Sequence, residues 1–164
     1  MGTSPLGIRL LSILAAVAFI GVASAQDAEK KVIPPQAELE KQFKETLSDC
    51  VFDGHWCMVN EGKLTEEKSE KYNISSATKS GQDVWIIYAK MQFQGKDVNV
   101  PVPVQVKWAG DTAVITLDKV TIPGLGTYSA RVLVFEGTYS GTWSAGDHGG
   151  MLHGIIRKKD KKAE

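Results

Sequence analysis

The chain has 164 residues, 43% of them hydrophobic and 23% charged, and its 19 basic residues balance its 19 acidic ones. This length corresponds to about one domain, and a net charge near zero excludes the broad basic surface by which proteins bind nucleic acid or anionic membranes. The lysine-rich tail at 157–162 is a local exception, which we interpret as a solvated terminus.

The segment 1–25 has the three parts of a secretory signal peptide. A short start carrying Arg9 precedes the uninterrupted apolar run 10–22, and Ala-Ser-Ala at 23–25 is a small-residue cleavage site. The apolar run is shorter than the roughly 20 residues that a membrane-spanning helix needs. We therefore expect no transmembrane segment and an exported protein of the periplasm or the extracellular space; an uncleaved N-terminal anchor is the alternative.

A single helix is expected at the start of the mature chain. A flexible, polar lead over 26–35 ends in two prolines, which form a stiff spacer. Over 36–49, Leu39, Phe43 and Leu47 recur every four residues, which places them on one face of a helix. The pattern predicts one amphipathic helix before the period changes.

Cys50 and Cys57 are the two cysteines of the chain. In an exported protein, an isolated pair at this short spacing predicts one disulfide, which would tie the end of the helix to the first strand. No further ligands follow at the spacing of a zinc finger, so the pair does not indicate a metal site. Two free, buried thiols are the alternative.

From Val51 onward the chain alternates with a period of two, and turns containing glycine separate its β-rich runs. Such short turns exclude parallel crossovers. The expected class is all-β, with 36–164 as one domain: an antiparallel up-and-down meander of eight strands that closes into a barrel, with the helix over one mouth. A two-sheet sandwich is the alternative. The strands are expected at 55–60, 69–79, 83–93, 97–108, 112–121, 127–135, 138–144 and 150–158.

The fourth expected strand carries two prolines on its polar face. Its apolar face holds Val98, Val100, Val102, Val104, Val106 and Trp108. Pro101 and Pro103 lack backbone N–H groups, and because they are two residues apart, both missing donors face the same neighbouring strand. We therefore predict continuous pairing with the third strand, across the turn at Gly95-Lys96. Pairing with the fifth strand should survive only near the turn at Gly110-Asp111, and the gap would offer a ligand a lateral entry.

Gly54-His55-Trp56, just after the helix, resembles the G-x-W signature of lipocalins and related calycin barrels. The resemblance covers this tripeptide and the strand count; the other lipocalin motifs are absent. It implies a lipocalin-like barrel in which Trp56 packs at the closed end against a basic residue of the last strand, with Arg157 as the match and Lys158 next. The chain also resembles a group of secreted planctomycete proteins through the stretches at 108–112 and 123–126, which implies no activity.

Three tryptophans and one arginine are the candidate ligand-binding residues. Trp85, Trp108 and Trp143 either line a cavity or fill the core of a small barrel. Arg131 lies in mid-strand on the same face as Leu133. Facing inward, its guanidinium would need a carboxylate partner; facing outward, its stem would lie on the surface.

Two histidines and an aspartate, Asp147, His148 and His153, surround the last expected turn. Zinc sites need three or four converging ligands, so we interpret these side chains as surface residues and expect no metal.

No set of catalytic acids, bases or nucleophiles can be assembled from the sequence, so it predicts neither an enzyme nor a cofactor. The expected function is a non-catalytic, secreted binding module for a small apolar or amphipathic ligand. The alternative is a structural or protein-interaction domain of the cell envelope with a filled core.

Overall fold

A computed structural model describes residues 32–93, 96–123 and 125–159. The signal peptide expected at 1–25, most of the lead, Gly95 of the expected turn and the end of the lysine-rich tail lie outside these residues.

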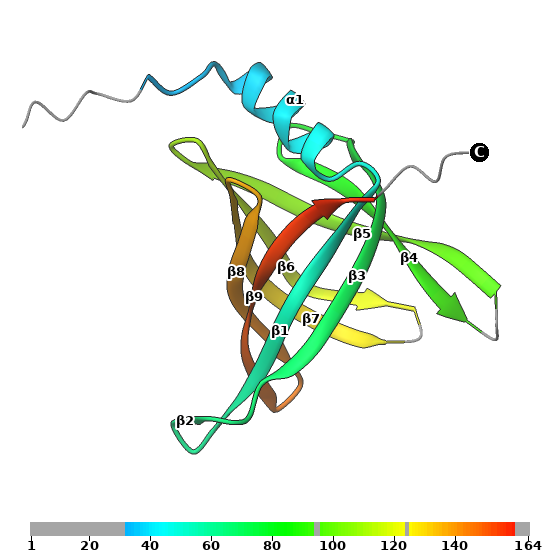
Figure 1. The fold of residues 1–164 in the computed structure, drawn as a ribbon, viewed down its shortest axis with the longest axis vertical. Helices are drawn as coiled ribbons and strands as arrows, with labels where there is room; N and C mark the ends of the chain where they lie inside the picture. The colour runs from blue at the N-terminus through cyan, green and yellow to red at the C-terminus, as the bar shows by residue number, and fades with distance from the viewer. Residues whose placement is uncertain (1–31, 94–95, 124, 160–164) are drawn as a thin grey trace, which may run out of the picture. The chain divides into compact units, whose positions relative to one another are not determined.

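Within the described residues, eight long antiparallel strands close into a barrel, and one short helix lies across one end of it (Figure 1). The strand order is β1-β3-β4-β5-β6-β7-β8-β9, and pairing of β1 with β9 closes the ring. The expected barrel is confirmed and the sandwich alternative is excluded. The elements are α1 (Gln36–Thr46), β1 (Cys50–Asn60), β2 (Lys63–Leu64), β3 (Lys68–Lys79), β4 (Val84–Phe93), β5 (Lys96–Ala109), β6 (Thr112–Ile122), β7 (Gly126–Phe135), β8 (Thr138–Ala145) and β9 (His148–Lys158).

The largest departure from the expected boundaries lies between the helix and the first strand. The helix ends at Thr46, and β1 begins at Cys50 rather than at His55. Between them Asp49 adopts a left-handed conformation with φ 48°, and its N–H donates to the carbonyl of Ser75 at 3.1 Å. This turn ends the helix early and starts the strand early. The two-residue β2, which pairs with the end of β1, was not expected.

The apolar face of α1 covers the end of the barrel at which β1 begins. Leu39, Phe43 and Leu47 are buried, as their spacing predicts. The ring of Phe43 packs edge-on against Trp85 at 5.0 Å and against Trp108 at 6.1 Å between centroids. These contacts close one mouth of the barrel.

Two lysines of the barrel strands form polar contacts with the helix. The ammonium of Lys158, in β9, donates to the carbonyls of Glu45 and Ser48 at the helix C-terminus. Cations at this position satisfy the free carbonyl groups and complement the helix dipole. On the other side Lys79 of β3 forms an ion pair with Glu40 at 2.6 Å.

Pairing between β5 and β6 stops halfway, as the two prolines of β5 predict. On its β4 side, β5 pairs without a break from Lys96 to Gln105. On its β6 side the ladder runs only from Gln105 to Ala109. Beyond Thr116, β6 pairs with β7 alone. The far ends of the β4–β5 hairpin and the β6–β7 hairpin diverge there (Figure 1). The predicted interruption is confirmed.

The predicted disulfide between Cys50 and Cys57 is wrong, because both residues lie on the same strand and both are free. An extended strand rises about 3.3 Å per residue, so about 23 Å separates them, whereas a disulfide needs Cα atoms within roughly 7 Å. Being an odd number of residues apart, they also face opposite sides of β1. Cys50 faces the interior with 0% of its surface exposed, and Cys57 faces outward with 5% exposed.

Candidate functional site

The inward side chains of the barrel are buried near α1 and become more exposed toward the other end. Under the helix, Trp85 is only 2% exposed. Farther along, inward-facing Trp56 and Trp143 are half-buried, and Tyr72 is 45% exposed. The interior is therefore closed at the helix end and accessible at the other. We call the accessible region the open half of the barrel; its inward side chains include those of Trp56, Lys68, Glu70, Tyr72, Tyr139 and Trp143.

A buried carboxylate lies at the base of the open half. Among the described residues, Glu70 of β3 is the charged residue that the fold buries, with 8% of its surface exposed. Tyr139 of β8 donates its hydroxyl to Oε1 of Glu70 at 3.0 Å, and Tyr72 donates to Oε2 at 2.7 Å. Both oxygens thus accept a charge-assisted hydrogen bond, which offsets part of the cost of removing the charge from water.

Two glycines make room for this contact. Glu70, Gly54, Gly154 and Tyr139 form one row across β3, β1, β9 and β8, each paired with the next. A Cβ atom on Gly54 would lie 2.5 Å from the Tyr139 hydroxyl, and one on Gly154 would lie 2.7 Å from the Tyr139 ring. The Tyr139 ring therefore lies over two residues that have no side chain, and its hydroxyl reaches the carboxylate of Glu70. A side chain at either glycine would block this contact.

The environment keeps both phenols protonated. Burial, and then the neighbouring carboxylate of Glu70, raise the pKa of Tyr139 above its ordinary value. Burial of its hydroxyl, at the inner end of a side chain that is 45% exposed as a whole, and the hydrogen bond to Glu70 likewise raise the pKa of Tyr72. Both hydroxyls therefore act as donors to the carboxylate near neutral pH.

Two tryptophans lie inside the open half beyond the carboxylate. The rings of Trp56 and Trp143 meet edge to face at 5.5 Å, and the ammonium of Lys68 lies 5.3 Å from the centre of the Trp56 ring. The indole N–H of Trp143 is buried and finds no acceptor among the described residues. This arrangement places apolar aromatic surface in the open half, beside one buried hydrogen-bond donor that has no acceptor among the described residues.

The four candidate ligand-binding residues do not come together. Trp85 and Trp108 pack against Phe43 under the helix, away from Trp143. Arg131 faces outward, because Val132 and Val134 are the buried residues of β7, and it pairs with the carboxylate of Asp118 at 3.0 Å. Only Trp143 lies in the open half; Trp85 and Trp108 fill the core under the helix, and Arg131 takes the outward alternative.

The expected contact between Trp56 and Arg157 is wrong. Arg157 lies on the outer face of β9 and forms an ion pair with Asp53. The basic group over the Trp56 ring is Lys68, from β3 rather than from the last strand. Since α1 covers the opposite end of β1, Trp56 does not lie at the closed end of the barrel.

Sequence reasoning missed Glu70 and Tyr139. The alternation of Glu70, Tyr72 and Ile74 places them on one face of a strand. The sequence alone does not show that this face points inward, because β3 carries polar residues on both faces and the sequence does not give its register. The signal available for this contact was the pair Glu70 and Tyr72, a carboxylate two residues from a tyrosine, on the strand next to the one that contains Gly54.

The histidines separate into two locations. His148, at the tip of the β8–β9 hairpin, interacts with Asp147 at 3.2 Å. His153 lies farther along β9, and its register partner is His55 of β1 rather than His148. Asp147, His148 and His153 are exposed, as expected, and His55 is exposed as well.

Comparison with protein-family profiles, with curated proteins and with solved structures finds no match for the chain. No helix in the described part of the chain has the length and hydropathy needed to cross a bilayer. Functional inference therefore depends on the geometry of this barrel.

Proposed function

We propose that the chain is an exported, non-catalytic binding module that takes a small amphipathic ligand into the open half of its barrel. The observation that carries the proposal is the exposure of inward-facing side chains: Tyr72 points into the barrel and is nevertheless 45% exposed. The interior of an eight-stranded barrel is either filled by side chains or wide enough to hold one small ligand, and the exposure of Tyr72 supports the second.

The chemistry of the open half indicates what such a ligand would look like. Trp56 and Trp143 present apolar ring surface, which favours a hydrophobic or aromatic body. A buried donor left unpaired costs about 1–3 kcal/mol, so a ligand that displaces the side chains covering the indole N–H of Trp143 would be favoured by carrying a hydrogen-bond acceptor. A ligand with an apolar body and a polar group suits both features.

The interrupted ladder between β5 and β6 supports a second route into the interior. Val102 of β5 and Leu117 of β6 face inward and are half-buried, and no backbone pairing joins the strands between these positions. A ligand entering here would pass between two hairpins without breaking a ladder.

A specific observation also favours the alternative, a structural or protein-interaction domain with a filled core. Aromatic rings in the interior pack against one another, Phe52 with Tyr139 at 4.7 Å and Trp56 with Trp143 at 5.5 Å. In that case the rings occupy the space that a ligand would need.

Titration of the purified protein with N-phenyl-1-naphthylamine, a neutral apolar fluorophore, distinguishes the two. The binding module should enhance the fluorescence saturably, and Trp56→Ala should weaken binding roughly tenfold or more, by the transfer free energy of a buried aromatic side chain. The matched control is Leu133→Ala, on the outer face and 44% exposed, which should leave binding unchanged. No saturable enhancement, or equal weakening by both substitutions, would refute the proposal.

A further inference from the structure

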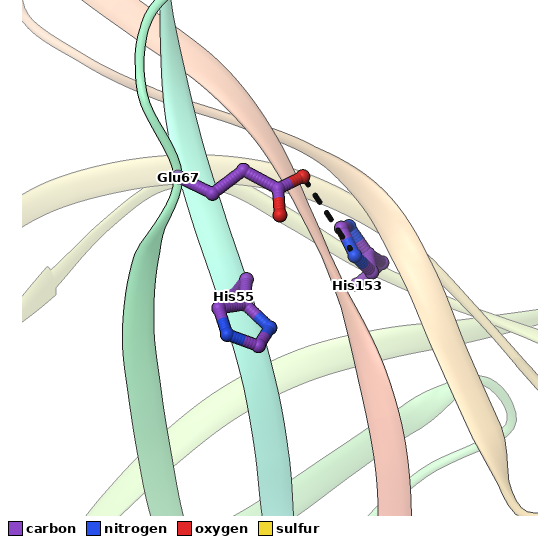
Figure 2. A group of neighbouring side chains, drawn as sticks. All are labelled: His55, Glu67 and His153. Atoms are coloured by element: carbon purple, nitrogen blue, oxygen red, sulfur yellow. Dashed lines mark ion pairs between the residues drawn. The ribbon is translucent and has the colours of Figure 1, made fainter.

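Two histidines and a glutamate, His55, His153 and Glu67, lie close together on the outer face of the barrel (Figure 2). His55 of β1 and His153 of β9 are direct register partners, and Glu67 lies on the segment that leads from β2 into β3. One ligand atom from each of the three lies within 4.8 Å of the others. Nε2 of His153 and Oε1 of Glu67 form an ion pair at 3.8 Å.

The backbone holds all three positions in place. The ladder between β1 and β9 is continuous from Cys50 to Met58, so the two imidazole rings lie side by side with 6.1 Å between centroids. The segment carrying Glu67 is attached on both sides. Thr65 exchanges two 2.9 Å hydrogen bonds with the backbone of Met58, and Lys68 pairs with Trp56.

We propose that His55, Glu67 and His153 form a binding site for a divalent transition-metal ion, with Zn²⁺ as the ion that best suits the donors. Zinc accepts imidazole nitrogen and carboxylate oxygen at about 2.0–2.2 Å, which places tetrahedral ligands about 3.3 Å apart. All three side chains are exposed, and changes in their side-chain torsion angles would bring the ligand atoms over the remaining distance. Two histidines and one carboxylate leave the fourth position for water or a further ligand.

The surroundings suit a cation. Outward cations on the flanking strands, Lys71 and Arg157, pair with Asp53 instead of with Glu67. The outward neighbours of the two histidines across the sheet are Ser69, beside His55, and Ser140, beside His153. The two imidazole donors favour zinc over Ca²⁺ and Mg²⁺, which prefer oxygen ligands.

The test is calorimetric titration of the purified protein with Zn²⁺ alone. The expected result is one ion per chain, with affinity that falls on acidification because protons compete for the imidazole nitrogens. His55→Ala, His153→Ala and Glu67→Gln should each weaken binding by at least roughly tenfold, since even the loss of an outer-shell partner costs 10- to 100-fold. The matched control is His148→Ala, which removes the third histidine of the chain and should leave affinity unchanged.

Co²⁺ provides an independent readout, because tetrahedral Co²⁺ absorbs strongly in the visible. The unmodified protein should give this spectrum and His153→Ala should lose it, while circular dichroism shows that the variant remains folded. Absence of saturable Zn²⁺ binding would overturn the site, and so would weakening by His148→Ala equal to that by His153→Ala. Binding of the naphthylamine probe should be unchanged in the His55, Glu67 and His153 variants, so failure of the metal site and failure of the interior site are distinguishable; His148→Ala is not used for this comparison, because the His148 ring packs against Trp143 at 5.7 Å.

Discussion

Tyr139 of β8 donates its hydroxyl to Glu70 of β3 at 3.0 Å, across the two strands that lie between them. The ring passes over Gly54 and Gly154, which occupy the intervening positions of the same row. The contact places a carboxylate at the base of the open half and fixes its orientation. It also gives Gly54, the first residue of the G-x-W tripeptide, a physical role in this barrel.

Gly54→Ala should destabilise the fold. The added Cβ would lie 2.1 Å from the carbonyl oxygen of His153 and 2.5 Å from the Tyr139 hydroxyl, so backbone must shift. We expect a loss of about 1–3 kcal/mol in the free energy of unfolding, the usual cost of overpacking, measured by urea denaturation. Gly81→Ala is the control, because its Cβ would meet nothing closer than 3.5 Å. Equal stability of the two variants would contradict the proposed role of the glycine.

Tyr139→Phe should destabilise the protein through Glu70. The substitution keeps the ring and removes one donor to the carboxylate, for which we expect a loss of about 1.5–3 kcal/mol. In a double-mutant cycle with Glu70→Gln, the two effects should not add, because both act on one hydrogen bond. Tyr128→Phe removes an exposed hydrogen bond to the carbonyl of Leu125 and should cost less. Additive effects of the Tyr139 and Glu70 substitutions would show that the hydrogen bond contributes nothing to stability.

Stability should fall in alkaline solution because of these same phenols. The pKa values of Tyr139 and Tyr72 are raised in the folded state, so the folded chain retains protons that the unfolded chain loses above its ordinary tyrosine pKa of about 10. Their contribution is complete below that pH and is lost as the pH rises through the folded pKa values. In a series of urea midpoints that starts at about pH 8, the decline due to the phenols should therefore begin near pH 10, and Tyr139→Phe should flatten it. An equally steep decline in that variant would assign the effect to other groups.

The strand pattern and the β5 prolines were predictable because both are local signals. Alternating valines and two missing donors on one edge determine which face of β5 is buried and which neighbour it pairs with, whatever the rest of the fold. The gap beyond Gln105 follows directly from Pro101 and Pro103.

The interior site was not predictable because it depends on register. Glu70 meets Tyr139 only because Gly54 pairs with both Glu70 and Gly154, a relationship among four strands. The face of Arg131 was ambiguous for another reason. Both faces of β7 are apolar, with Leu133 and Phe135 on one and Val132 and Val134 on the other, and the valines are the buried pair.

The disulfide prediction was wrong because the boundary expected between the helix and the first strand was wrong. It placed Cys50 at the end of a helix that ran to Asp49 and Cys57 in the first strand. The left-handed Asp49 instead starts β1 at Cys50, and the same strand then carries Cys57 too far away.

Both thiols should be free but slow to react in the folded protein. Burial raises the pKa of Cys50 to about 11, which leaves little reactive thiolate near neutral pH. We expect slow reaction with a thiol-specific reagent at about pH 8, where an ordinary cysteine is reactive, and two thiols per chain after unfolding without a reductant. Finding none after unfolding would mean that the cysteines are oxidised and that β1 does not hold them apart.

Native mass spectrometry of protein purified from its own host tests the ligand proposal most directly. If the open half of the barrel holds a ligand, the folded protein should carry the mass of one small organic molecule, released on unfolding, and Trp56→Ala should reduce its occupancy while Leu133→Ala does not. Protein that emerges at the mass of the chain alone, together with absence of naphthylamine binding, would contradict the proposal and favour a structural domain with a filled core.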